Sequence, residues 1–203
     1  IVTAAGSGFD VGAEKALEAA NARGISRMFA ITRCDADNTN FYKTFAAIKE
    51  AVGGAICPVI VPYMAGDKVA AYVNLASRKA FDYSSGTKKE VDMPSDPQID
   101  EMLEILTEAV ATSDDELMEK FFEGESFTRE EIIKALNTGV SDGSVIPVYA
   151  CAGYTCEAVD MILDEIVYSA PSAAETSGEG DLACDENGPL AAICFKTVAD
   201  PFV

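Results

Sequence analysis

The segment from Met28 to Asp35, Met-Phe-Ala-Ile-Thr-Arg-Cys-Asp, constrains the fold more than any other part of the sequence. It is a short apolar run that ends in a polar loop with one carboxylate, and helical patterns lie on both sides. Such runs are typical of a central strand in a parallel sheet with crossover helices. Because ligands of these folds bind beyond the carboxyl ends of the strands, we expect Thr32, Arg33 and Asp35 to lie at a recognition site.

The pattern on either side of this run is that of an α/β protein. Residues 1–5 predict a strand, and residues 11–23 and 40–52 predict helices. Residues 145–150 again predict a buried strand, followed by a helix over 156–168. The apolar residues of that helix that are expected to face inward are Val159, Ile162, Leu163 and Ile166. The sequence therefore predicts a doubly wound sheet.

The middle of the chain has a different character. Short strands are predicted at 56–63, 69–75 and 80–83, with the spacing of an antiparallel meander. Three helices should follow, and the spacings Ser113 to Glu116 and Thr128 to Glu131 fit capping boxes at two of them. We therefore interpret 55–143 as an inserted α+β subdomain between the two parts of the sheet domain, 1–54 and 144–171.

Composition changes again after the last predicted helix. Residues 172–188 are small, acidic and rich in turn formers, which predicts an acidic linker. Residues 189–203 begin with an alternating pattern, so we expect the first strand of another domain there. Since the sequence opens in a strand without Met, we expect it to be the interior of a longer protein.

The overall charge and the absence of histidine exclude several classes of function. A formal net charge of −19 opposes binding to nucleic acid and to anionic membranes, and favours a basic protein partner. No apolar run reaches the length of a membrane span. The chain has six cysteines without a Cys-x-x-Cys pair and no histidine, which excludes Cys/His zinc sites and histidine-based catalysis. Reduced, buried thiols in a cytoplasmic protein are the expected state.

Glycine patterns limit what the chain can do with a nucleotide. No phosphate-binding loop of the Gly-x-x-x-x-Gly-Lys-Ser/Thr type is present, so this segment alone should not hydrolyse one. The turn Gly6-Ser7-Gly8 between a strand and a helix invites a dinucleotide hypothesis, but Gly12 comes one residue late for that motif. A surface turn that leads into a helix is the favoured interpretation.

Asp35 fits the recognition of guanine better. A carboxylate at a strand end can accept hydrogen bonds from both the ring N–H and the exocyclic amine of guanine, which adenine cannot offer. The loop Ala152-Gly153-Tyr154 follows the later strand and should lie close by in a parallel sheet, where it could donate a backbone N–H to the base oxygen. Each loop alone is a weak signal, since an aspartate after a strand is often a helix cap.

Together these segments resemble translation elongation factor G, the ribosomal translocase GTPase, over nearly the whole chain. The likeness includes Thr32-Arg33-Cys34-Asp35 followed by Asn40-Phe41-Tyr42, at the position of the family's Asn-Lys-x-Asp guanine motif. It also includes the acidic stretch 112–136, which resembles the family's insertion, and residues 145–148 and 199–203, which resemble its last G-domain strand and the opening of its β-barrel second domain.

The departures from the family fall at the nucleotide. Thr32 stands where the family has Asn, Arg33 where it has Lys, and Ala152-Gly153 where it has Ser-Ala. Each lost hydrogen bond costs about 1 to 3 kcal/mol. Asp35 and a backbone N–H at Gly153 remain, so the resemblance implies selective but weakened binding of guanine in a divergent relative.

The resemblance also implies cofactors and partners. GTP or GDP would bind in the complete protein, with the phosphate groups and the magnesium ion held upstream of Ile1. The ribosome would be the partner, contacted through the basic carboxyl-terminal domain of its stalk protein. The acidic residues expected on the insertion's helix are Asp100, Glu101, Glu104 and Glu108. A solvated helix face explains them equally well. The alternative function is a stalk-binding paralogue with little or no nucleotide binding.

Overall fold

The computed structural model describes residues 1–176, 184–185, 187–188, 190, 192, 194 and 196–199. The chain forms two units, Ile1–Ala170 and Pro171–Val203. The strands of the first unit are β1 (Val2–Ala4), β2 (Phe29–Thr32), β3 (Ile56–Ala65), β4 (Lys68–Asn74), β5 (Lys79–Asp82), β6 (Lys89–Val91) and β7 (Ile146–Ala150). Its helices are α1 (Val11–Asn21), α2 (Phe41–Val52), α3 (Pro97–Ala111), α4 (Asp115–Glu123), α5 (Arg129–Asp142) and α6 (Val159–Ser169).

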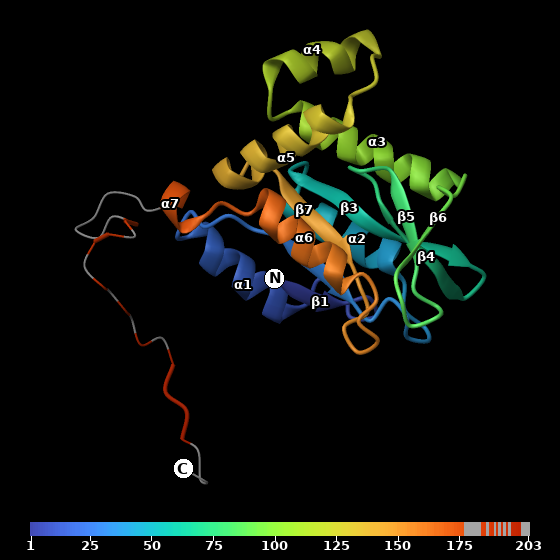
Figure 1. Ribbon diagram of the computed structural model, residues 1–203, viewed down its shortest axis with the longest axis horizontal. Helices are drawn as coiled ribbons and strands as arrows, with labels where there is room; N and C mark the ends of the chain where they lie inside the picture. The colour runs from blue at the N-terminus through green and yellow to red at the C-terminus, as the bar shows by residue number, and fades with distance from the viewer. Residues whose placement is uncertain are drawn as a thin grey trace. The chain divides into compact units, whose positions relative to one another are not determined.

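One open sheet of seven strands organises this unit, in the order β1-β2-β7-β3-β4-β5-β6. The first four strands in that order are parallel, and β3 to β6 continue as an antiparallel meander. Figure 1 shows α6 in front of the sheet and α2 behind it. This arrangement confirms the predicted α/β class, a partial sheet of the P-loop GTPase type.

The predicted central strand is β2. It pairs in parallel with β1 on one side and with β7 on the other, and Phe29 and Ile31 are fully buried. Helix α2 begins after Asn40, whose side chain accepts the N–H of Lys43, and it buries Phe45 against the core. The apolar run at Met28 therefore forms the strand that the sequence predicts.

The middle segment shares the sheet with the rest of the unit. Strand β3 lies between β7 and β4 although it contains Pro58 and Pro62, and its register with β7 shifts between Pro58 and Ile60. Helix α3 packs against β3. The predicted insertion over 55–143 therefore extends the central sheet and does not build a second one.

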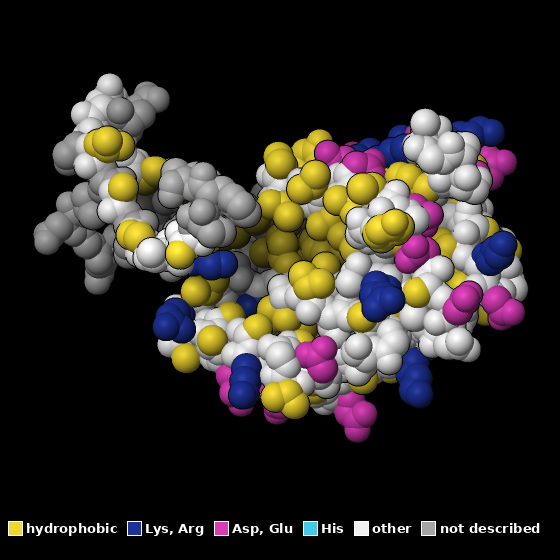
Figure 2. Space-filling model, turned by 90° about the horizontal axis from the view of Figure 1, so that it is seen from below, with side chains coloured by type: hydrophobic (Ala, Val, Ile, Leu, Met, Phe, Trp, Pro, Cys, Tyr) yellow, Lys and Arg dark blue, Asp and Glu magenta, His cyan; other side chains and the backbone are white. Residues whose placement is uncertain are grey.

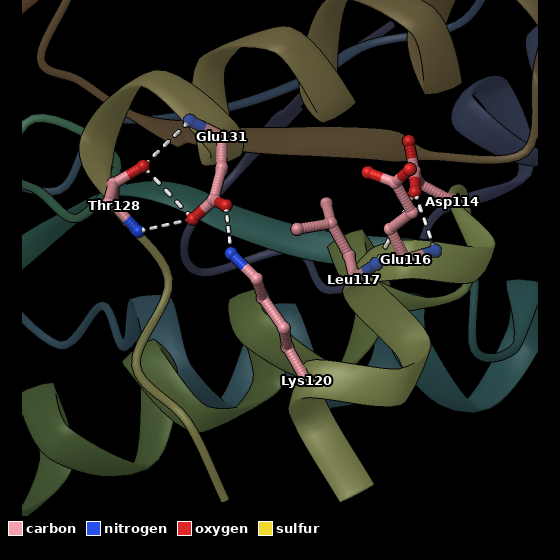
Figure 3. Close-up of polar contacts among 6 residues, drawn as sticks. All are labelled: Asp114, Glu116, Leu117, Lys120, Thr128 and Glu131. Atoms are coloured by element: carbon pink, nitrogen blue, oxygen red, sulfur yellow. Dashed lines mark hydrogen bonds and ion pairs between the residues drawn. The ribbon is translucent and has the colours of Figure 1, made fainter. Parts of the chain in front are cut away.

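The junction between α4 and α5 is fixed by two helix caps and an ion pair (Figure 3). Asp114 caps α4 by accepting the N–H groups of Glu116 and Leu117, so the predicted capping box from Ser113 is wrong by one residue. The box of Thr128 and Glu131 is confirmed at α5. Lys120 of α4 pairs with the same Glu131, which ties the two helices together.

Helix α6 corrects a second prediction. Leu163 and Ile166 were expected to face inward but are 58% and 43% exposed. The helix begins at Val159 and not at 156, and Met161 and Ser169 are buried on its inner face. Leu163 and Ile166 consequently lie on the opposite face. Apolar side chains also gather in a hollow on the face seen in Figure 2.

The cysteines divide into two groups. Cys34, Cys57 and Cys151 are buried as expected, whereas Cys156, Cys184 and Cys194 are exposed, and all six are free. The expectation of buried thiols therefore holds for the three that lie in or next to the sheet strands. The exposed three lie in loops, where no packed layer covers them.

In the second unit the structure describes one short helix, α7 (Ala173–Thr176), with Glu175 accepting hydrogen bonds from the N–H and hydroxyl of Ser172. Much of the predicted linker over 172–188 and of the predicted strand over 189–203 lies outside the described residues. No helix among the described residues is both long enough and apolar enough to cross a membrane.

Candidate functional site

The parallel pairing of β2 with β7 brings the two predicted base-reading loops together. The N–H of Cys34 donates to the carbonyl of Cys151 at 3.2 Å, and the N–H of Cys151 donates to the carbonyl of Ile31 at 3.0 Å. Both loops therefore leave the sheet at its carboxyl edge, the lower edge in Figure 1. Their proximity follows from the sheet topology and was predicted.

Thr32 braces the second loop. Its hydroxyl oxygen accepts the N–H of Gly153 at 3.4 Å. The next residue, Arg33, has a positive φ of 61°, a conformation that is uncommon outside glycine. This turn leaves Arg33 exposed while Cys34 is buried. The N–H predicted to bind the base oxygen is thus engaged by Thr32, and it would exchange this partner for a base.

Asp35 is exposed, and a residue that the sequence analysis missed holds its carboxylate. The hydroxyl of Thr155 donates to Oδ2 of Asp35 at 3.4 Å, and it also lies 3.5 Å from the carbonyl oxygen of Ala152. Ala152 cannot supply a hydroxyl to Asp35, and Thr155 supplies one from three residues further along the same loop. The one available signal was a hydroxyl residue in that loop.

The loop that carries Thr155 is closed on itself and tied to β4. Ala152 and Glu157 exchange both backbone hydrogen bonds, at 3.0 and 3.1 Å. The hydroxyl of Tyr72 donates to Oε2 of Glu157 at 3.1 Å. Burial raises the pKa of Tyr72 far above its ordinary value, so the hydroxyl keeps its proton and can donate.

The remaining predicted residues contribute less. Ala152 is fully buried and packs in the core, while Tyr154 is fully exposed. Burial raises the pKa of the Cys34 thiol to about 12, which leaves it protonated and unreactive at neutral pH. The structure thus brings Thr32, Gly153 and Asp35 together with Thr155. Among the described contacts it does not connect Arg33 or Tyr154 to them.

The chemistry of this site fits guanine in part. The exposed Asp35 carboxylate has an oxygen, Oδ1, for which no hydrogen bond is described, and the exposed guanidinium plane of Arg33 can stack on a purine. None of the pockets found among the described residues is lined by both loops. A polar pocket of about 590 Å³ lies beside them, lined by Cys34 and residues 36–42. The guanine site is therefore an exposed surface between two loops.

The dinucleotide hypothesis finds less support in the geometry. In such proteins the helix N-terminus receives the pyrophosphate. Here the carboxylate of Asp10 accepts the N–H of Ala13 at the start of α1, and the hydroxyl of Thr3 closes the preceding turn on the carbonyl of Gly8. A carboxylate already occupies that N-terminus, as in the favoured interpretation of a surface turn.

No protein-family model matches the chain. The crystal structure of ttk003000868 from Thermus thermophilus is similar to it, with a TM-score of 0.76 and 28% sequence identity over 88% of this chain. The two chains share this fold. The match covers 27% of the Thermus protein, so the present chain corresponds to about a quarter of that longer chain.

The predicted partner-binding residues lie on α3 and are all exposed: Asp100, Glu101, Glu104 and Glu108. Three of these, Glu101, Glu104 and Glu108, line a groove of about 660 Å³ between α3 and the segment that joins α4 to α5. Phe121 was expected to be buried but is 38% exposed and lines the same groove. The groove therefore combines acidic groups with apolar surface.

Proposed function

We propose that this chain is the guanine-reading part of the nucleotide-binding domain of a ribosome-associated GTPase that resembles elongation factor G. In the complete protein, GTP and GDP bind here and hydrolysis is coupled to movement on the ribosome. The observation that carries the proposal is the joining of two loops at the carboxyl edge of the sheet, through Thr155 to Asp35 and Gly153 to Thr32. The fold shared with the Thermus protein is compatible with it.

Each residue has a defined task in this proposal. Asp35 accepts the ring N–H and the exocyclic amine of guanine, and the N–H of Gly153 donates to the base oxygen. Arg33 stacks its guanidinium plane on the purine. Thr32 takes the N–H of Gly153 when no base is present. Phosphate binding and hydrolysis depend on residues outside this chain.

The test is a calorimetric titration of the full-length protein with GDP and with ADP. We expect binding of GDP and none of ADP at the same concentration, because ADP lacks the two donors that Asp35 accepts. Equal affinities would contradict base recognition by Asp35. Binding of neither nucleotide would contradict the GTPase proposal as a whole.

The groove beside α3 favours a second candidate, a stalk-binding module that does not depend on nucleotide. Its acidic rim, at Glu101, Glu104 and Glu108, complements a basic partner, and the exposed ring of Phe121 offers an apolar anchor. The basic carboxyl-terminal domain of the ribosomal stalk protein has the required chemistry. The two candidates are compatible if the complete protein carries both sites.

Charge reversal tests this candidate. Replacing Glu101, Glu104 and Glu108 together by lysine should abolish binding of the stalk domain, measured by surface plasmon resonance with the full-length protein. Reversal of the exposed Glu14 and Glu18 on α1 is the matched control and should leave most of the binding. Equal losses in both variants would indicate a general effect of charge. Unchanged binding after GDP or GTP addition would favour the module over the GTPase.

A further inference from the structure

The hairpin of β4 and β5 holds the segment after β7 through a series of side-chain hydrogen bonds. Three donors on or next to the hairpin meet three carboxylates on that segment. The pairs are Tyr72 with Glu157 at 3.1 Å, Tyr83 with Asp160 at 2.6 Å and Asn74 with Glu165 at 2.7 Å. Lys88 adds an ion pair to Asp160 at 2.6 Å.

The first of these bonds differs from the others in what it holds. Asp160 and Glu165 lie on α6, whose backbone is fixed by its own helical hydrogen bonds. Glu157 lies in the loop, and its backbone pairs with Ala152 across the base of the turn. Among these three bonds, the one to Glu157 therefore acts most directly on the residues that carry Gly153 and Thr155.

The path from Tyr72 to the base-reading carboxylate is short. The Tyr72 ring is 1% exposed and packs edge-on against Tyr83, with ring centroids 5.8 Å apart, so its hydroxyl has a fixed position. That hydroxyl holds Glu157, the pairing of Glu157 with Ala152 closes the turn, and Thr155 within the turn donates to Asp35. Each step is a hydrogen bond in the structure.

We infer that Tyr72 of β4 is a positioning residue for the guanine site, acting through Glu157 and Thr155 on Asp35. This inference rests on the proposed function. It gives the antiparallel hairpin a regulatory role, because a partner that displaces β4 would loosen the base-reading loop without touching the nucleotide. Thr155 takes the part of the hydroxyl that Ala152 lacks.

The experiment compares Tyr72→Phe with Tyr83→Phe in the full-length protein. Both variants remove one hydroxyl from a tyrosine that donates to a carboxylate, and both keep the packed ring. We expect Tyr72→Phe to accelerate GDP dissociation by about tenfold. Tyr83→Phe should leave the rate unchanged within about twofold, because its partner lies on the helix. Similar rates in the two variants would overturn the inference.

Thr155 provides a second arm. Thr155→Val removes the hydroxyl at constant shape and should also accelerate GDP dissociation, and Thr155→Ser, which restores a hydroxyl, should return the rate to that of the wild type. Failure of serine to rescue would show that shape and not the hydroxyl matters, against the inference.

Hydrogen exchange separates this inference from the proposed function. In the nucleotide-free protein, the Ala152 and Glu157 amides should exchange faster in Tyr72→Phe and not in Tyr83→Phe. If the wild type binds no guanine nucleotide, both the proposed function and the regulatory role fall. If it binds and the exchange is unchanged, the inference alone falls.

Discussion

Gly139 shows how one residue can fix the approach of two elements. It lies in α5, and a Cβ built there would lie 2.5 Å from Cγ2 of Val145, just before β7. The N–H of Val145 also donates to the carbonyl of Gly139 at 2.9 Å. The chain therefore turns from α5 into β7 at a distance that only glycine allows.

We predict that Gly139→Ala destabilises the protein by about 1 to 3 kcal/mol, although alanine favours helices, because the added methyl group overpacks the contact with Val145. Chemical denaturation of the full-length protein measures the change. Stabilisation by the substitution would contradict the proposed close contact.

A second residue, Glu165, makes stability depend on pH. Burial raises the pKa of its carboxyl group above the ordinary value, and the bond from Asn74 offsets only part of the effect. Arg129 also acts to lower it, while Asp164 acts to raise it. A raised folded-state pKa means that the folded protein binds more protons, so stability falls as pH rises through the window above the unfolded value.

We therefore predict that Glu165→Gln is more stable than the wild type at neutral pH, and that the difference shrinks as pH falls toward about 4, near the unfolded-state pKa. Glutamine can still accept the hydrogen bond from Asn74. Thermal unfolding over this pH range measures it. A difference that is independent of pH would show that the charge of Glu165 is not the cause.

At the scale of elements, the junction of α4 and α5 shows the opposite sign. Bonds from Lys120 and from Thr128 lower the pKa of Glu131 to about 2. A lowered folded-state pKa contributes stability that is present above the unfolded value, 4.5, and is lost as pH falls through about 2. The contribution is small because the ion pair is exposed.

The prediction for this junction concerns pH and helix pairing together. Stability of the wild type should fall relative to Glu131→Gln between about pH 5 and about pH 2, as measured by circular dichroism during urea denaturation. Lys120→Met should show the same reduced dependence on pH. Parallel pH profiles in all three proteins would contradict the role of this pair.

The elements also show which parts of the fold can be predicted from sequence. Strands β2 and β7 and helix α2 were predicted because their apolar periodicity is local information. The central place of β3 was not predicted, since pairing with β7 is a long-range contact and Pro58 and Pro62 argue against a central strand. The inner face of α6 was misassigned because polar Glu165 and Ser169 occupy it.

The candidate site follows the same rule. The proximity of Asp35 and Gly153 was predicted from parallel topology. The role of Thr155 was not, because its contact with Asp35 depends on the turn closed between Ala152 and Glu157. Side-chain contacts set by loop closure leave no periodic pattern in the sequence.

At the scale of the whole molecule, net charge governs encounter with partners. A formal charge of −19 should accelerate association with a basic domain and make it sensitive to salt. We predict that the association rate with the stalk carboxyl-terminal domain falls about tenfold or more between low and high ionic strength, while dissociation changes less. Stopped-flow fluorescence measures both rates. Association that is independent of salt would contradict electrostatic recognition.

The central claim is that Asp35 reads guanine at the joined loops of β2 and β7. The most direct test is titration of the full-length protein and of Asp35→Asn with GDP and with xanthosine diphosphate. We predict that the substitution weakens GDP binding by about tenfold to a hundredfold and strengthens xanthosine diphosphate binding, because an amide complements the xanthine oxygen. Unchanged affinity for both nucleotides in Asp35→Asn would contradict the claim.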